Sequence, residues 1–261
     1  MSTNLCADLL LLSIAAPSQI VSVSRQSQDA TQSPVAEQAA AYPANAGGVE
    51  DLLYRKPDIA LVYSGWNGGR FGDLLAGQGI EVVPVPYPTD WDDALDTARK
   101  VAARIGRAEQ GAALAAGAEQ RMRALAAGVP ALKALYLRPS GGSAGRGTYV
   151  DDVLTRLGLR NLVGEHGHAG WAAYPLERIV LDPPDVFLLG YFEQRQPLTA
   201  SAYARHPLLR KLLAETPQVA VPSRVWGCGG LELVGAAEAI AEAVVEAIAE
   251  PVQTIGSGVA R

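Results

Sequence analysis

Apolar and polar residues recur along the chain in two different patterns. Short continuous apolar runs, rich in Val, Ile and Leu and bounded by glycine, proline or polar residues, predict buried β-strands. The predicted strands are 19–24, 58–65, 79–86, 133–139, 185–191 and 218–226. Stretches of helix formers lie between them. The predicted helices are 5–16, 70–78, 149–159, 175–182, 208–215 and 231–249. This alternation is typical of an α/β fold with parallel sheets.

One region departs from the alternation. Residues 92–125 are almost all helix formers, and the sequence IGRAEQ at 105–110 is expected to divide them into two helices. The second of these helices has no predicted strand beside it and is long for a globular protein. It is therefore expected to connect two parts of the fold.

The two parts share a repeated pattern. The first contains GGVEDLLYRKPDIALVYSG at 47–65, and the second contains YPLERIVLDPPDVFLLGY at 174–191. Each is a helix that bears a glutamate, followed by a proline–aspartate pair and an apolar strand. The repeat predicts two Rossmann-like α/β lobes with parallel-rich central sheets, at 1–106 and 129–261, joined by one long backbone helix at 107–128.

Composition narrows the class of protein. With 261 residues the chain is long enough for two lobes that each have a hydrophobic core. A hydrophobic content of 49% with 19% charged residues is ordinary for a soluble protein and argues against large-scale disorder. The net charge of −5 and the scattered basic residues argue against a nucleic-acid partner.

The apolar segments also bear on membranes and targeting. No apolar stretch reaches the roughly 18–20 residues that a membrane helix needs, so no membrane insertion is expected. The run LLLLSIAAPS at 9–18 has the character of a signal-peptide core, but the residues before it contain no Lys or Arg and include Asp8. We therefore interpret 5–16 as a helix of the fold and expect no signal peptide within this chain.

Four segments, taken in their order and spacing, resemble a known family. They are TNLCADLLL near the N-terminus, the repeated unit, the helical run GRAEQGAALAAGAEQRMRAL, and RVWGCGG near the C-terminus. Together they resemble the periplasmic substrate-binding proteins of ABC importers, of the helical-backbone class that carries vitamin B12, ferric siderophores and haem. The pair NLCAD and WGCGG is most similar to a BtuF-like, cobalamin-binding subgroup.

The resemblance implies a function and a set of partners. It implies a periplasmic monomer that captures a metal chelate in a cleft between the lobes, with little movement of the lobes. The protein would deliver this ligand to the permease subunits of an ABC transporter with their ATPase. The expected ligand is cobalamin or another corrinoid, with a ferric siderophore or haem as the alternative, and no separate cofactor or catalytic residue is expected. A cysteine-dependent enzyme is the more remote alternative.

The candidate ligand-binding residues follow the predicted strands, because ligands of parallel α/β sheets bind beyond the carboxyl ends of the strands. The resemblance adds two loop residues, Tyr42 and Trp171. The full set is Asn4, Cys6, Arg25, Tyr42, Tyr63, Trp66, Arg138, Ser140, Trp171, Tyr191, Trp226 and Cys228. Aromatic rings suit the flat apolar face of a corrin or porphyrin, and Arg and Asn side chains suit its polar rim. Each tryptophan could instead cover the core of its own lobe.

Two glutamates hold equivalent places in the repeated unit. Glu50 belongs to the first copy and Glu177 to the second. The resemblance implies that they contact arginines of the permease, one from each lobe, which suits a partner with two-fold symmetry. The alternative is that they are ordinary surface glutamates.

The sequence gives weaker support for a metal-binding site or a phosphate-binding site. His166 and His168 lie two residues apart in the glycine-rich EHGHAG and are weak candidates for a zinc site or an axial ligand, so no protein metal site is expected. Glycine-rich stretches at 138–149 and 226–236 match neither the phosphate-loop nor the dinucleotide-binding pattern. They are better interpreted as loops beside a ligand.

The two cysteines, Cys6 and Cys228, leave several roles open. A catalytic cysteine needs a lowered pKa and a nearby base, and no His or Asp lies close to Cys228 in the sequence. A disulfide between them would hold a cleft between opposite lobes shut, so we expect two separate thiols that face the cleft. The glycines of WGCGG are then expected to leave room for a bulky ligand, with Trp226 as the stronger contact.

Overall fold

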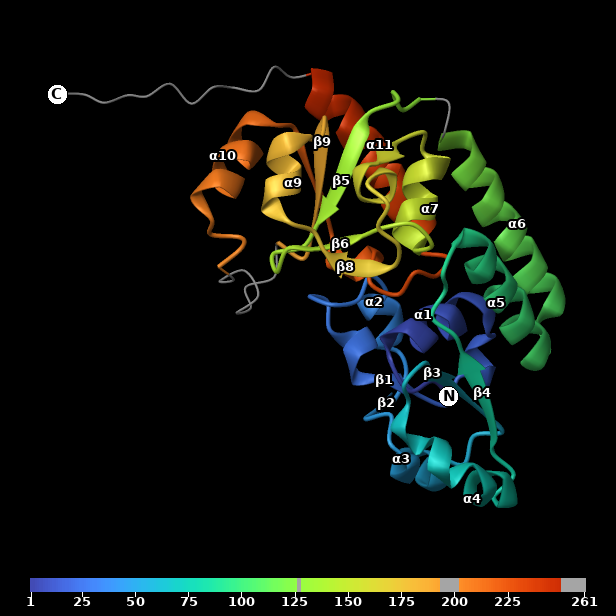
Figure 1. Ribbon diagram of the computed structural model, residues 1–261. Coiled ribbons are helices and arrows are strands. Elements are labelled where there is room, and N and C mark those ends of the chain that lie inside the picture. The colour runs from blue at the N-terminus through green and yellow to red at the C-terminus, as the bar shows by residue number, and fades with distance from the viewer. Residues whose placement is uncertain (126–127, 193–201, 250–261) are drawn as a thin grey trace. The chain divides into compact units, whose positions relative to one another are not determined.

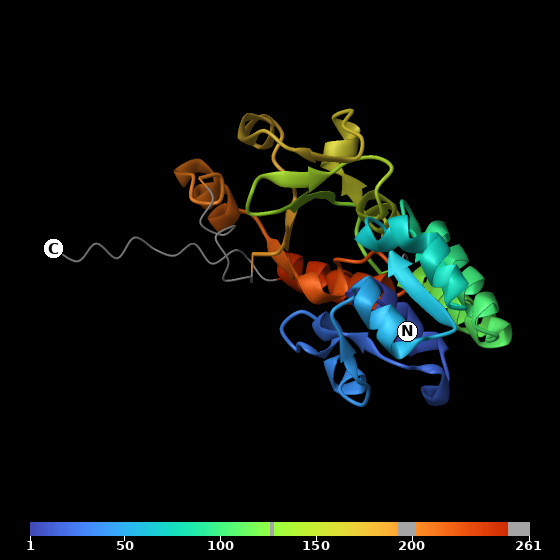
Figure 2. The same cartoon turned by 90° about the horizontal axis from the view of Figure 1, so that it is seen from below.

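The computed structural model describes residues 1–125, 128–192 and 202–249, which form two compact units (Figure 1). The first unit comprises residues 1–121 and 224–234, and the second comprises the other described residues. The elements of each can be followed by colour in Figure 1 and, from below, in Figure 2. The sequence boundaries assigned 224–234 to the C-terminal lobe, whereas this segment lies with the first unit.

Helices and strands alternate along most of the chain. The helices are α1 (Leu5–Ile14), α2 (Ala36–Ala39), α3 (Val49–Arg55), α4 (Gly72–Gly77), α5 (Trp91–Arg104), α6 (Ala108–Leu125), α7 (Tyr149–Arg156), α8 (Leu162–Glu165), α9 (Leu176–Leu181), α10 (Pro207–Glu215) and α11 (Leu233–Ala249). The strands are β1 (Val23–Ser24), β2 (Ala44–Asn45), β3 (Ile59–Tyr63), β4 (Glu81–Val85), β5 (Lys133–Leu137), β6 (Gly142–Ala144), β7 (Arg160–Asn161), β8 (Trp171–Ala173), β9 (Val186–Gly190) and β10 (Gln218–Val221). The predicted α/β class with parallel-rich sheets is confirmed.

The first unit is built on parallel strands that the N-terminal residues join. β1 pairs with β2 and β3 pairs with β4, all in parallel. The backbone N–H of Ser2 donates to Ser22 (3.4 Å) and that of Thr3 donates to Leu61 (3.1 Å), so residues 1–3 lie between the two pairs. Because Ser2 pairs in parallel with Leu61 and β3 pairs in parallel with β4, the N-terminal segment, β3 and β4 have their carboxyl ends at a common edge.

α1 covers this sheet through its apolar residues. Ala7 and Leu11 are buried with Leu61 of β3 in one core. The helix begins where the Asn4 side chain accepts a hydrogen bond from the backbone N–H of Ala7 (3.1 Å). Full burial of a leucine side chain contributes roughly 1.5–3 kcal/mol, so packing, supported by a capped start, holds the helix in place.

A buried carboxylate ties α1 to the strands beneath it. Asp8 accepts hydrogen bonds from the hydroxyls of Ser2 and Ser24 and from the backbone N–H of Ser24 (3.0 Å). Burial raises the pKa of the Asp8 carboxyl, and these hydrogen bonds oppose the rise. The charge-bearing residue that argued against a signal peptide is therefore part of the interior of the fold.

The predicted pair of helices after residue 90 is observed with its break in the expected place. α5 ends at Arg104 and α6 begins at Ala108, within the interval 105–110. Trp91 at the start of α5 is fully buried, and its indole N–H donates to a carboxylate oxygen of Glu119 in α6 (2.6 Å). The long helix predicted at 107–128 corresponds to α6, and residues 126 and 127 lie outside the described residues.

The second unit is built on a four-stranded parallel sheet in the order β10-β9-β5-β7. Leu135 of β5 lies opposite Phe187 of β9, and both are buried. Ile179 of α9 and Leu209 of α10 belong to the same core. A separate antiparallel pair, β6 and β8, follows the end of β5. Because β5 and β9 are adjacent and parallel, the residues that follow them meet at one edge.

Two predicted strands are shorter than the apolar pattern indicated. The run 19–24 forms a strand only at Val23–Ser24, because Pro17–Gln19 turns into a 3₁₀ helix just before it. The run 218–226 ends as a strand at Val221, since Pro222 has no N–H to donate and a second 3₁₀ turn follows at 223–225. WGCGG is therefore part of a loop and does not continue a strand.

Candidate ligand-binding site

The carboxyl edge of the first unit carries a hollow of about 500 Å³. It is lined by the residues that follow the N-terminal segment, β2 and β3: Thr3, Asn4, residues 46–50, residues 63–68, Arg70 and Phe71. Three predicted site residues, Asn4, Tyr63 and Trp66, are among them. Asn4 also has a structural role, because its side-chain oxygen caps the start of α1.

Trp66 forms a fixed wall of this hollow. Its indole N–H donates to the backbone carbonyl of Gly47 (2.8 Å), and the ring is partly buried against the apolar core around Leu52. A Cβ atom at Gly68 would lie 2.1 Å from the Trp66 ring, so only glycine fits there. The side chain thus combines the two roles that the sequence left open, since it packs on its own unit and borders the hollow.

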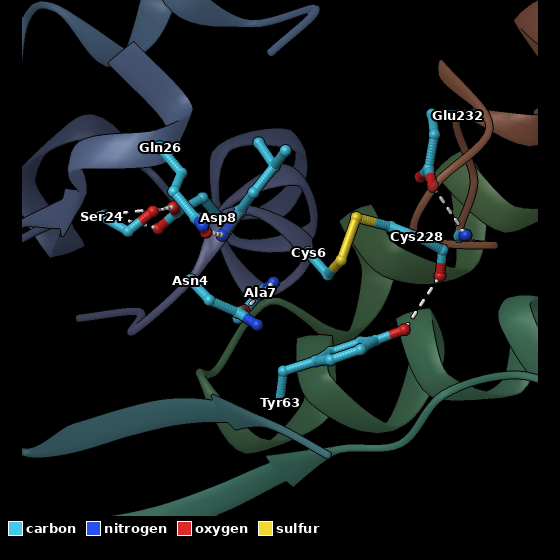
Figure 3. The surroundings of a disulfide bond; sticks show 11 residues. Asn4, Cys6, Ala7, Asp8, Ser24, Gln26, Tyr63, Cys228 and Glu232 are labelled. Atoms are coloured by element: carbon cyan, nitrogen blue, oxygen red, sulfur yellow. Dashed lines mark hydrogen bonds between the residues drawn. A yellow bond between two sulfur atoms is a disulfide. The ribbon is translucent and has the colours of Figure 1, made fainter. Parts of the chain in front are cut away.

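The cysteines correct one expectation, because Cys6 and Cys228 form a disulfide (Figure 3). The prediction of two separate thiols is wrong for a topological reason. Segment 224–234 returns to the first unit, so the bond joins α1 to a loop of the same unit and does not connect opposite lobes. Neither cysteine is a free thiol, which removes the basis for a cysteine-dependent enzyme.

Further contacts hold the same loop. The phenol of Tyr63 donates to the backbone carbonyl of Cys228 (3.0 Å), and Glu232 accepts from the backbone N–H of Gly230 (2.8 Å) (Figure 3). Burial, together with nearby Tyr87 and Glu232, raises the pKa of Tyr63, so the phenol remains protonated and able to donate. Burial also raises the pKa of Glu232. The loop that contains WGCGG is therefore attached to the rest of the first unit at two points, the disulfide and the Tyr63 hydrogen bond, and the Glu232 hydrogen bond closes a turn within it.

The other predicted residues of the first unit differ in exposure. Trp226 is fully buried, so it is part of the interior and not a surface for contact with a ligand. Tyr42 packs partly buried against the core beneath α1, while Arg25 is exposed at the start of a 3₁₀ turn. Tyr87, which follows β4, meets the ring of Tyr63 edge-on at 5.9 Å and is exposed.

The second unit gathers its predicted residues into one cluster around Arg138. This residue follows β5, and its guanidinium lies 4.3 Å from the ring centre of Trp171 and 4.8 Å from that of Tyr191. Its Nε–H donates to the phenol of Tyr136 (3.2 Å). Burial acts to lower the pKa of Arg138, but the tyrosines around it outweigh that effect and the pKa is raised. The cation is therefore permanent and held in a fixed orientation.

Backbone geometry supports this cluster. Tyr191 has a φ of 66°, a left-handed conformation that costs a residue with a side chain of the order of 1–3 kcal/mol. Gly190 precedes it, and a Cβ atom there would lie 2.3 Å from the phenol oxygen of Tyr136. The end of β9 is thus shaped around the ring of Tyr136 and the position of Tyr191.

Sequence reasoning missed Tyr136 and Tyr149 as members of this cluster. The Tyr149 ring lies 5.6 Å from that of Trp171. The sequence could have identified Tyr136, because this residue lies two positions before Arg138 on a predicted strand and so shares its face of the strand. Nothing in the sequence pointed to Tyr149, since its proximity to Trp171 depends on the path of β6 and β8.

Ser140, which was predicted, is exposed and lies on the rim of a separate hollow of about 450 Å³ that Glu177 also borders.

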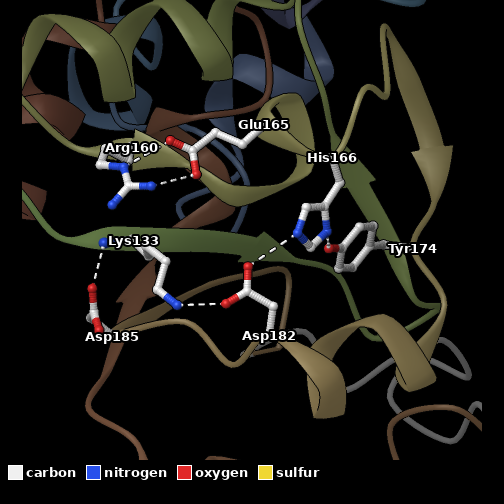
Figure 4. Close-up of polar contacts among 7 residues, drawn as sticks. All are labelled: Lys133, Arg160, Glu165, His166, Tyr174, Asp182 and Asp185. Atoms are coloured by element: carbon white, nitrogen blue, oxygen red, sulfur yellow. Dashed lines mark hydrogen bonds and ion pairs between the residues drawn. The ribbon is translucent and has the colours of Figure 1, made fainter.

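The histidine loop forms a hydrogen-bonded network (Figure 4). Nδ1 of His166 lies 2.5 Å from the phenol of Tyr174, and Nε2 lies 3.1 Å from Asp182. The hydrogen bond from Lys133 (2.6 Å) is the main cause that lowers the pKa of Asp182. His168 packs edge-on against Tyr174. Within the described ranges no three His, Cys, Asp or Glu side chains converge as metal ligands.

The two glutamates of the repeated unit are both exposed. Glu50 lies in the first turn of α3 and Glu177 in the first turn of α9. Among the residues that the structure describes, neither carboxylate takes part in a hydrogen bond or a salt bridge. Over the same residues, no helix is both long and apolar enough to cross a bilayer.

Solved structures with the same fold include three named for tetrapyrrole ligands. The periplasmic haem-binding protein RhuT from Roseiflexus sp. RS-1 is 20% identical with a TM-score of 0.73, covering 94% of this chain and 97% of its own. The haem-binding protein HutB of Vibrio cholerae is 20% identical with a TM-score of 0.74, covering 92% and 96%. The vitamin B12-binding protein BtuF of Vibrio cholerae is 17% identical with a TM-score of 0.65, covering 95% and 97%. At these identities the likeness concerns the fold.

A family model described as periplasmic binding protein matches residues 1–214. No curated protein matches the chain. The family is one of binding proteins, which confirms the prediction that the chain is not an enzyme. Since the match spans most of a chain whose fold agrees with it, the chain belongs to the periplasmic binding protein family.

Proposed function

We propose that the protein is the substrate-binding component of an ABC importer, that it works as a monomer in the periplasm, and that it captures a metal tetrapyrrole. The family supports the binding role. The observation that carries the ligand class is the position of Arg138 over the rings of Trp171 and Tyr191, beyond the carboxyl ends of β5 and β9. Aromatic side chains and a cation together suit a flat apolar ligand with an anionic rim.

The geometry of Arg138 favours a carboxylate as the group that it binds. A guanidinium that lies over aromatic rings keeps the N–H groups at its edge available, and two of them can donate to one carboxylate. Within the described residues only its Nε–H is used, by Tyr136. Haem carries carboxylates on its rim, whereas the side chains of cobalamin are mainly neutral amides. Haem is therefore the ligand that we propose first, in agreement with the names of RhuT and HutB.

Cobalamin is the second candidate, supported by a different observation. The disulfide joins the NLCAD and WGCGG segments, which are the two on which the resemblance to a cobalamin-binding subgroup rests. BtuF is also among the proteins of similar fold. A ferric siderophore remains the third possibility within the same class.

Direct titration tests the ligand class. Purified protein is titrated with hemin, cyanocobalamin and ferrichrome while the absorbance of the chelate and tryptophan fluorescence are followed. We expect hemin to bind at micromolar concentration or tighter, with a shift of its main absorbance band and quenching of Trp171, which is exposed in the cluster. Binding of cyanocobalamin alone would assign the second candidate, and no binding of any of the three would contradict the proposed function.

A matched pair of variants tests the role of the arginine. Arg138→Gln removes the cation and should weaken hemin binding about 10–100-fold, the effect of losing a charged hydrogen-bonding group. Hemin dimethyl ester, which lacks free carboxylates, should bind equally to the variant and the parent. Arg210→Gln, which changes an exposed arginine on α10, is the control and should leave binding unchanged. Equal behaviour of the two variants would exclude the cluster as the ligand site.

The matched glutamates supply the proposed contact with the permease. We propose that Glu50 and Glu177 each face a basic residue of one permease subunit. Their equivalent positions, exposure and unpaired carboxylates support this assignment. Charge reversal at either position should weaken association with the importer and leave ligand binding intact.

A further inference from the structure

Each of the two glutamates has an apolar neighbour on the same face of its helix. On α3, Tyr54 lies one turn after Glu50, and 85% of it is exposed. On α9, Leu181 lies one turn after Glu177, and 82% of it is exposed. Residues four positions apart face the same side of a helix, so each carboxylate stands beside a large apolar group in water. Figure 1 shows the two helices.

The buried side of the two helices matches as well. Leu52 stands midway between Glu50 and Tyr54, and Ile179 stands midway between Glu177 and Leu181. Both aliphatic side chains are fully buried in the cores of their units. Each helix is therefore anchored through the same position, and this anchoring turns the acidic and apolar pair toward solvent in both copies.

The exposure of these two apolar side chains is exceptional in this molecule. No other large apolar side chain among the described residues is more than 47% exposed. Apolar area that remains in water contributes nothing to folding and becomes stabilising only when a partner covers it. Tyr54 and Leu181 occupy the same position in the two copies of the repeat, so one shared role accounts for the exposure of both.

Electrostatics and shape specify what covers this surface. Glu50 and Glu177 lie in the first turns of their helices, and each supplies an acidic group at the surface. Each carboxylate borders a hollow, of about 500 Å³ in the first unit and about 450 Å³ in the second. A partner that places a basic side chain at each hollow and an apolar recess one helical turn away would complement both pairs.

We infer that Glu50 with Tyr54 and Glu177 with Leu181 form two copies of one docking contact, and that the permease of the importer covers both. This rests on the proposed function, since the occupant is the two-fold permease. The glutamates provide long-range attraction and orientation, and the apolar groups provide the desolvated anchor that slows dissociation. A partner with two equivalent subunits fits a surface that the chain carries twice.

Binding to the importer tests the anchor. The permease–ATPase complex that takes up the ligand with this protein is purified into lipid nanodiscs, and its affinity for ligand-loaded protein is measured by biolayer interferometry. Tyr54→Ser and Leu181→Ser should each weaken association by about tenfold or more, as for an interface anchor, mainly through faster dissociation. Tyr54→Phe keeps the ring and should bind as the parent does.

Matched controls separate the anchor from a general loss of apolar surface. Leu74→Ser on α4 and Leu208→Ser on α10 remove other exposed apolar side chains, one from each unit, and should leave association unchanged. All four serine variants should keep the ligand affinity and the melting temperature of the parent, because the side chains that they replace are exposed.

The outcomes distinguish this inference from the function on which it rests. If Glu50→Lys and Glu177→Lys weaken association while Tyr54→Ser and Leu181→Ser match the controls, docking is by charge alone and the inference is overturned. If the parent protein binds hemin, cyanocobalamin and ferrichrome no more than a control protein does, the proposed function fails. Loss of association in Tyr54→Ser and Leu181→Ser but not in Leu74→Ser and Leu208→Ser, with the ligand still bound, supports both.

Discussion

At the scale of single residues, two side chains are held in states that the surrounding fold must stabilise. Asp8 is a buried carboxylate whose hydrogen bonds come from Ser2 and Ser24. Tyr191 has a left-handed backbone beside the ring-stacked Arg138. The first residue serves the fold, because it ties a helix to two strand segments. The second is expected to serve the ligand, since its strained position is useful only for what its ring does.

Replacement of Asp8 by Asn tests the first of these roles. Asp8→Asn leaves one acceptor oxygen in place of two, so a buried donor from Ser2 or Ser24 loses its partner. We expect the free energy of unfolding to fall by about 1–3 kcal/mol near neutral pH, measured by urea denaturation.

The pH dependence of that loss follows from the raised pKa of Asp8. An acid with a raised folded-state pKa binds its proton more readily in the folded protein, so the parent gains stability as pH falls through that pKa. Asn at this position has no such gain. The loss caused by Asp8→Asn should therefore grow as pH falls from neutral into the acidic range, and a loss that shrinks as pH falls would contradict the assignment.

Replacement of Tyr191 by Gly separates stability from binding. Glycine adopts a φ of 66° without strain, so Tyr191→Gly should leave the free energy of unfolding within about 1 kcal/mol of the parent value or raise it. Hemin affinity should fall, because Arg138 loses one of its stacked rings. A large loss of stability with unchanged affinity would show instead that the ring serves packing.

At the scale of elements, the most important feature is the loop 224–234, which packs with the first unit. Segment 224–234 is connected to α1 by the disulfide and to β3 by the hydrogen bond from Tyr63 to Cys228. The carboxyl edge of the first unit is therefore completed by residues from near the other end of the chain.

Removal of the disulfide tests how much this connection stabilises the protein. The two cysteines are 222 positions apart, so the bond restricts the unfolded chain strongly. The double variant Cys6→Ala with Cys228→Ala should lower the free energy of unfolding by about 2–5 kcal/mol. Hydrogen exchange should also quicken across 224–234. The parent protein treated with a reductant is the control and should behave as the double variant does, and unchanged stability in both would contradict this role.

At the scale of the whole molecule, each unit presents its own candidate edge, and the two edges can be tested for ligand contact separately. The first unit offers Trp66, which lines its hollow, and Tyr87, which contacts the ring of Tyr63, and the second offers Trp171, Tyr191 and Arg138.

Single substitutions test each edge separately. Tyr87→Ala in the first unit and Arg138→Gln in the second are each titrated with hemin, and calorimetry gives the stoichiometry. We expect Arg138→Gln to lower hemin affinity, because it removes the cation of the aromatic cluster. A loss of affinity in Tyr87→Ala alone would assign the ligand to the edge of the first unit and contradict the role of Arg138.

Much of the fold and part of the site were readable in the sequence, because both depend on local periodicity. The strand and helix alternation, the break between α5 and α6, and the equivalent positions of Glu50 and Glu177 follow from the spacing of apolar residues and glycine or proline. The position of Arg138 at the end of β5 followed from the same pattern. A strand end identifies an edge residue wherever the strand is later placed.

Other features were decided only by the tertiary structure, because they depend on where distant segments meet. The disulfide was misjudged since nothing in the local sequence shows that 224–234 belongs with the first unit. Trp226 is buried for a reason that its neighbours in the chain do not reveal. The rings around Arg138 come from β5, β8, α7 and the end of β9, and their meeting depends on the order of strands in the sheet. Local spacing determines which residues reach an edge, and the path of the chain determines which of them meet.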